Sequence, residues 1–246
     1  MSGGTVPIGP TLLVALTVLT LAGAAVIRFS GLGPGRTILT AAARATVQLG
    51  GVSLIIVAVL AAWWSTALFI LLMYVVASVT AHRRIGPAGP RRVAPLAIAV
   101  GVAPSLAVLL ASRALPATPL VVLPTAGILI GGAMTATSLA GRRTLDELRT
   151  RHGEYEAGLA LGLLPRDAAL EICRPAAGQA LVPALDQTRT VGLVTLPGAF
   201  VGVLLGGAGP LQAGATQLLI LLTLLAVEAV AIAMVVELIV RGRAAD

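Results

Sequence analysis

Long runs of apolar residues, separated by short polar segments, make up most of this chain. A helix that crosses a bilayer needs ~20 mostly apolar residues, within a range of about 17–25. Seven segments meet this requirement, so the pattern predicts an all-α integral membrane protein with seven transmembrane helices. The predicted spans are approximately residues 9–27, 44–62, 65–81, 93–112, 119–140, 185–207 and 213–240.

The composition supports this assignment. The 246 residues are 57% hydrophobic and 11% charged, whereas soluble domains average about 45–50% apolar and about 25% charged. No region outside the predicted spans is large enough for a separate catalytic core, and we see no convincing internal repeat. We therefore expect residues 1–246 to form a single transmembrane domain, with a cytosolic segment at about 141–184.

Basic residues lie almost entirely on one side of the predicted spans. Sixteen of the seventeen arginines fall in loops and a tail on that side, and Arg113 alone falls on the other. Cytoplasmic loops carry an excess of basic residues, so the N-terminus is predicted outside and the C-terminus in the cytosol. Topology thus explains the net charge of +7, and we predict a lipid membrane but no nucleic acid as a partner.

Some chemistry is excluded by residues that the chain lacks. There is no Lys, so a P-loop, whose Lys reaches the nucleotide phosphates, cannot form, and any ATP-driven step needs another subunit. Cys173 is the single cysteine, which excludes an intramolecular disulfide and a Cys-based zinc site. His82 and His152 are interpreted as residues of Arg-rich loops. No nucleophile–base set is evident, so we predict no catalytic residues and no cofactor on this chain.

The polar segment between the fifth and sixth spans contains a spaced motif. Glu156-Ala157-Gly158 is followed after three residues by Gly162, and after nine more by Ile172-Cys173-Arg174-Pro175. Gly162 can end a helix in a left-handed conformation, and Pro165 suits the first turn of a second helix. The spacing resembles the coupling loop of ATP-binding-cassette permeases, with Gly158 and Arg174 as departures. The resemblance implies that Glu156, Ala157, Gly158, Gly162, Pro165, Ile172 and Pro175 contact a separate ATPase.

A second resemblance covers most of the chain. Its motif is Gly192–Gly198 (GLVTLPG), and further matches are residues 44–49, 131–135, 138–139 and 159–162. These residues resemble the Fet-type iron-export permeases, a family that includes plant aluminium-tolerance permeases. Gly132 stands where we expect Asn. The resemblance implies ATP-driven export of a metal ion, with iron favoured, across the plasma membrane. ATP and Mg²⁺ would bind a stand-alone ATPase. A cycle with two ATPase chains needs two coupling loops, which predicts a permease homodimer.

The sixth span contains the first candidates for the transport pathway. Gly198, Gly202 and Gly206 form a stripe of small residues that is typical of helix packing, with substrate contact as the alternative. Pro197 should break or kink the helix and free backbone carbonyls. Broken helices often line transport paths. Thr195, Pro197 and Gly198 are therefore predicted to move or to face the substrate.

Other polar residues inside spans are also candidates. Met134, Thr135 and Ser138 could contact a passing transition metal, or the hydroxyls could bond their own helix. Gln48 needs a partner, whether for helix packing or in the pathway. Glu228 lies deep in the seventh span, where a carboxylate marks a functional site by default, and a structural partner is its alternative. Glu237 lies on the opposite face of that helix, with Arg241 four residues later.

Two other functions stay open. The spans lack clusters of His, Cys and carboxylates, so the metal ligands are unknown, and a non-metal polar solute such as a nucleotide sugar is a possible cargo of an ATP-driven permease. The other alternative is a secondary transporter driven by an ion gradient. Glu228 favours this alternative, and the absence of inverted repeats argues against it.

Overall fold

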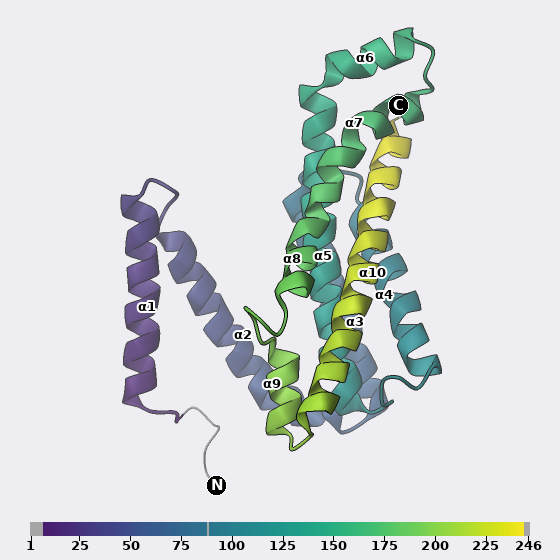
Figure 1. Ribbon diagram of the computed structural model, residues 1–246. Helices are drawn as coiled ribbons and strands as arrows, with labels where there is room; N and C mark the ends of the chain where they lie inside the picture. The colour runs from purple at the N-terminus through teal and green to yellow at the C-terminus, as the bar shows by residue number, and fades with distance from the viewer. Residues whose placement is uncertain (1–6, 88, 244–246) are drawn as a thin grey trace. The chain divides into compact units, whose positions relative to one another are not determined.

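In the computed structural model, residues 7–87 and 89–243 are described, and their regular structure is helical apart from one isolated β-bridge. Six of these helices are long and apolar enough to cross a membrane (Figure 1). They correspond to the first five predicted spans and to the seventh, so the protein is an all-α, multi-pass membrane protein. The six are α1 (Pro10–Phe29), α2 (Arg36–Leu60), α3 (Trp63–Ile85), α4 (Val93–Ala111), α5 (Pro119–Thr150) and α10 (Pro210–Arg243).

The residues at the helix ends explain several of these bounds. Pro occupies the first turn of α1, α5 and α10, where its fixed φ suits a helix and its missing N–H is not needed. Gly86 follows α3 with φ +104°, a conformation that Gly adopts without strain. The fifth helix continues ten residues past the predicted boundary at 140, to Thr150, so its last turns are formed by the polar sequence that follows the apolar span.

The described chain forms two compact units, divided after Ala61. The first unit contains the antiparallel pair α1 and α2, which packs closely near the connecting turn. A Cβ at Gly35 would lie 2.6 Å from the carbonyl oxygen of Ala24, so only Gly fits there. Most side chains of this unit, including Gln48, are exposed within it.

The second unit contains α3 to α10, and its core lies among α3, α4, α5 and α10. Small residues bring these helices together. A Cβ at Gly101 on α4 would lie 2.8 Å from the carbonyl oxygen of Val227 on α10. Close packing of this kind supplies van der Waals contact where lipid removes most of the hydrophobic driving force between helices.

The predicted sixth span, residues 185–207, is not one continuous helix. Residues of this range belong to α8 (Val182–Thr190) and α9 (Gly198–Leu205), and residues 191–197 between them are not helical. Gly192 has φ +81°, and Pro197 is the N-cap of α9. A Pro inside a helix removes a hydrogen bond and clashes with the preceding turn, which explains the break. Alone, α9 reaches only about 12 Å at 1.5 Å per residue, so a crossing at this position stays a prediction.

Candidate functional site

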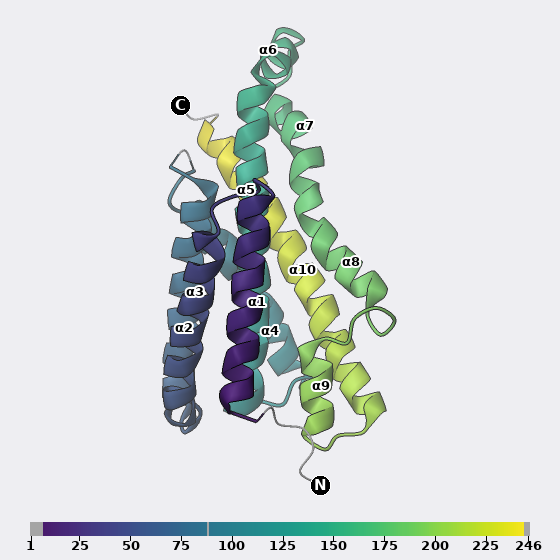
Figure 2. The same cartoon turned by 90° about the vertical axis from the view of Figure 1, so that its left-hand side faces the viewer.

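The predicted coupling segment, about residues 141–184, begins on the last turns of α5 and continues as two short helices at one end of the second unit. They are α6 (His152–Ala160) and α7 (Pro165–Gly178), and they lie at the same end as the C-terminal turn of α10 (Figures 1 and 2). The remainder of the segment is a single 3₁₀ turn, η1 (Gln179–Leu181), followed by α8. The predicted helix–turn–helix is therefore present.

Gly162 ends α6 as its position in the motif predicts. It has φ +90°, and its N–H donates to the carbonyl of Leu159 at 2.9 Å, while the N–H of Leu163 donates to the carbonyl of Gly158 at 3.0 Å. These two bonds define a Schellman motif, which pairs carbonyls that the helix end would otherwise leave free. Pro165 then begins α7, also as predicted.

A groove runs between α6 and α7. It is lined by Ala157, Gly158, Leu163, Ala168, Ile172 and Pro175, four of which the motif singled out. A Cβ at Gly158 would lie 3.2 Å from the Cβ of Ala168, so the small residue at this departure from the motif keeps the two helices close. Leu161 and Leu164 at the turn are 86% and 67% exposed, which gives the tip an apolar surface outside the span region.

Arg151, the C-cap residue of α5, connects α5 with α6 and α7. Its guanidinium donates to the Glu154 carboxylate at 2.8 Å and to the carbonyl of Ile172 on α7 at 3.4 Å. The hydrogen bond from Arg151 holds the pKa of Glu154 below its usual value, and the same bond raises the pKa of Arg151. Cys173, fully buried, lies against the carbonyl of Thr144 on α5 at 3.7 Å. The segment is thus fastened to the end of α5.

A separate ion pair fastens the segment to α10. Arg166, in the first turn of α7, donates from Nε and Nη2 to the two carboxylate oxygens of Glu237 at 2.7 and 2.8 Å. Arg241 donates to the same carboxylate at 2.6 Å, which confirms the predicted i, i+4 pair on α10. Hydrogen bonding to Glu237 raises the pKa of Arg166.

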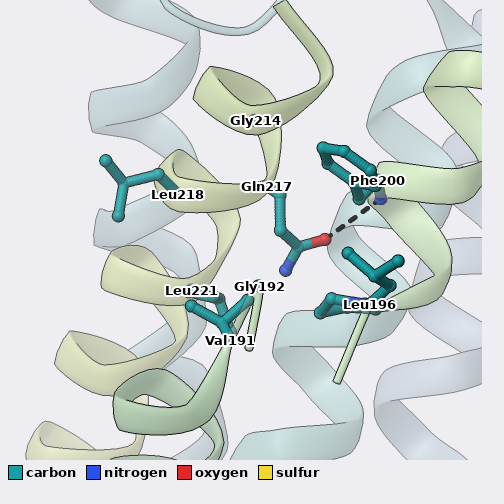
Figure 3. Close-up of a pocket in the computed structure, with 9 residues that line it drawn as sticks. Val191, Gly192, Leu196, Phe200, Gly214, Gln217, Leu218 and Leu221 are labelled. Carbon is teal, nitrogen blue, oxygen red and sulfur yellow. Dashed lines mark hydrogen bonds between the residues drawn. The ribbon is translucent and has the colours of Figure 1, made fainter. Parts of the chain in front are cut away.

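A pocket lies beside the break between α8 and α9, near the N-terminal end of α10 (Figure 3). The pocket is about 370 Å³, and its walls include Val191, Leu196, Pro197, Phe200, Gln217 and Leu221. The predicted element from Thr195 to Gly198 therefore borders a cavity through Leu196 and Pro197. The carbonyl of Thr195 accepts a bond from the N–H of Gly192 at 2.9 Å, so one of the carbonyls freed by the break is paired within the turn.

Gln217 is a residue of this pocket that the sequence interpretation missed. Its side chain is buried, and its Oε1 accepts a hydrogen bond from the N–H of Phe200 at 3.2 Å (Figure 3). Pro197 has no side chain that could cap α9, so Gln217 pairs one of the unpaired donors at the start of that helix. An amide within an apolar helix was the available signal, the same one that singled out Gln48.

The candidates on α5 are mostly accounted for by their own helix. The hydroxyls of Thr135 and Ser138 donate to the carbonyls of Gly131 and Met134 at 3.1 and 2.6 Å, as expected if they bond within their own helix. Met134 is partly buried against the core. On α9, a Cβ at Gly198 or Gly202 would meet nothing within 4 Å, so no part of the described chain packs against these two glycines.

Glu228 is 8% exposed, near the middle of α10. A Cβ at Gly132 on α5 would lie 2.7 Å from its Oε1, so the carboxylate fills space that Gly132 leaves free. Among the described residues, no group of three or more His, Cys, Asp or Glu could hold a metal ion. A charged side chain at the bilayer centre costs about 3 kcal/mol on insertion scales. Glu228 is the one charged side chain among the buried residues of the described chain, so we treat it as a candidate functional residue.

Residues 10–243 match a protein family described as "Uncharacterised protein family (UPF0014)". The chain belongs to this family. Its relatives there include a rice protein (Oryza sativa subsp. japonica), "UPF0014 membrane protein STAR2", which is 36% identical over 77% of this chain and 68% of its own length. "Protein ALUMINUM SENSITIVE 3" of Arabidopsis thaliana is 38% identical over 61% of this chain and 56% of its own length.

A bacterial relative is also similar. The "Probable iron export permease protein FetB" of Escherichia coli K12 is 34% identical over 53% of this chain and 50% of its own length. The resemblance found in the motifs, to iron-export permeases and to plant aluminium-tolerance proteins, is therefore confirmed. No solved structure matches the chain.

Proposed function

We propose that this UPF0014 member is the permease subunit of an ATP-binding-cassette exporter. A separate ATPase would drive it to move a metal ion such as iron out of the cytosol. The observation that carries the proposal is the pair α6 and α7, an apolar-tipped helix–turn–helix fastened to both α5 and α10. The relative named an iron export permease supports the choice of cargo.

The proposed orientation places the coupling segment in the cytosol. Ile85 at the end of α3 lies against Gly141 on α5, and Pro90 lies near Gly242 on α10, so the loop bearing four arginines lies at the coupling end. Arg113 follows the other end of α4. This distribution agrees with the positive-inside rule, with the N-terminus outside and the C-terminus in the cytosol.

The proposed mechanism is alternating access. Closure of an ATPase dimer would move the tip around Leu161 and Leu164. Arg151 would transmit this movement to α5, and Arg166 would transmit it to α10. Two ATPase sites need two coupling segments, so the working unit would be a permease homodimer with two ATPase chains in the plasma membrane. ATP and Mg²⁺ would bind the ATPase, because this chain has no Lys for a P-loop.

The deciding experiment is co-reconstitution of the permease with the ATPase that purifies with it. In inside-out vesicles, ATP added outside should drive Fe²⁺ uptake into the lumen, and vesicles with permease alone should show none. Full-speed transport by the permease alone would refute the proposal and favour the secondary transporter, for which Glu228 is the supporting residue. ATP-driven transport of a nucleotide sugar but not of Fe²⁺ would support the ATP-driven permease and refute the metal ion as its substrate.

A further inference from the structure

Glu228 makes no hydrogen bond or ion pair with any residue in the described parts of the chain, although its side chain is buried, with only 8% exposed.

The helices around Glu228 offer few charged groups that could pair with its carboxylate. Residues 93–111 of α4 contain no charged side chain, and the charged residues of α5 begin at Arg142, ten residues beyond Gly132. Arg174 on α7 lines a pocket with Ala229 and Ile232 but forms no ion pair with Glu228. On α10 itself, Glu237 lies on the opposite face.

The position of the Glu228 carboxylate is defined by its packing against α5. It fills a notch on α5 that exists because residue 132 is Gly, and a Cβ there would lie 2.7 Å from Oε1 and closer still to Leu224. The neighbouring Gly131 has no such role, since a Cβ there would meet nothing within 4 Å. The two adjacent glycines of the motif therefore differ, and only one makes room for the carboxylate.

Glu228 also shares a face of α10 with the pocket at the helix break. Gln217, Leu221, Leu224 and Glu228 recur at intervals of four, three and four residues, which aligns them along one side of the helix. Gln217 and Leu221 line the pocket, and Glu228 lies about 16 Å from Gln217 at 1.5 Å per residue. Leu221 and Leu224 separate the two.

We propose that Glu228, seated in the notch at Gly132, is the protein ligand for the cation that this permease carries. This inference rests on the proposed function. A divalent cation such as Fe²⁺ can bind a carboxylate oxygen and keep several of its waters. A single carboxylate binds weakly enough to release the ion, as transport requires. The ion would pass from the cytosolic end to Glu228, and then along the same face of α10 to the pocket at the helix break.

The first test measures equilibrium binding of Fe²⁺, without oxygen, to the purified full-length permease in detergent. Glu228→Gln keeps the shape and removes the charge, so affinity should fall about tenfold or more, the effect of one charged contact. Thr223→Val removes a hydroxyl that bonds the carbonyl of Leu219 on the same helix, and it should leave binding unchanged. Unchanged Fe²⁺ binding in Glu228→Gln overturns the inference.

The second test uses the glycine pair. Gly132→Ala should displace the carboxylate and weaken Fe²⁺ binding, whereas Gly131→Ala should not. Equal binding by the two variants also overturns the inference, even if Glu228→Gln does not fold. The proposed function fails separately. If Glu228→Gln exports Fe²⁺ normally in the presence of ATPase and ATP, the role of Glu228 is refuted and the exporter stands. If the wild type exports nothing with ATPase and ATP, the exporter itself is refuted.

Discussion

Arg166 and Glu237, 71 residues apart in the chain, form a two-point ion pair between the start of α7 and the C-terminal end of α10. The pair matches the planar guanidinium to both carboxylate oxygens, which fixes the relative orientation of the two side chains. Since α10 also carries Glu228 and Gln217, this contact connects the proposed ATPase-binding surface with residues of the proposed pathway.

Breaking this ion pair should uncouple ATP hydrolysis from transport. For Arg166→Gln we expect transported Fe²⁺ per ATP to fall by about fivefold or more, the lower end of allosteric coupling. Folding should change little, because the pair is partly exposed. The measurement compares hydrolysis and transport in the same vesicles. Arg189→Gln is the matched control, since among the described residues Arg189 pairs only with the exposed Asp186 on α8. Equal coupling in both variants would contradict the linkage.

Gly162→Val should also uncouple the two activities. A β-branched residue at φ +90° is strained by about 1–3 kcal/mol, so the turn between α6 and α7 should rearrange while membrane insertion is kept. Gly162→Asn is the matched variant, because Asn tolerates the left-handed conformation and should retain most of the coupling. ATPase stimulation by the permease measures the effect. Normal stimulation by the Val variant would count against a docking role for this turn.

Gln217→Leu should loosen α9 from α10. The change leaves the part-buried N–H of Phe200 without its acceptor, at a cost of at most about 1–3 kcal/mol, the range for a fully buried donor. We expect faster hydrogen exchange at the amide of Phe200 and a lower thermal midpoint. Gln212→Leu, at an exposed position in the first turn of α10, serves as the control and should leave both unchanged. Unaltered exchange at Phe200 in Gln217→Leu would show that the amide does not hold the break.

The Arg151–Glu154 pair predicts a pH effect on α6. Glu154 has a pKa below its ordinary 4.5 because Arg151 bonds its charged form. Its stabilising contribution is therefore present above pH 4.5 and is lost as pH falls through the lowered pKa. NMR titration of Glu154 should show this lowered midpoint, and Arg151→Gln should return it toward the ordinary value. An unchanged midpoint in Arg151→Gln would exclude the pair as the cause.

Local patterns in the sequence predicted most of the elements. Apolar length located α1 to α5 and α10, because a helix in lipid must satisfy its backbone internally and therefore needs a long apolar stretch. Gly162 and Pro165 marked the end of α6 and the start of α7, because both act through the backbone of their own residue. Pro197 indicated a break for the same reason, although the sequence pattern alone suggested a longer sixth span than the structure contains.

The contacts between distant residues were decided only by the tertiary structure. Nothing near Arg166 in the sequence indicates Glu237, and nothing near Phe200 indicates Gln217. Gly132 was singled out as a departure from a motif, but its meaning depends on Glu228, 96 residues later. Helix propensity and hydrophobic length act over a few turns, so sequence alone determined where this chain forms helices. Which helix faces meet depends on side-chain packing between segments far apart in the chain, and that packing places the carboxylate, the amide and the ion pair.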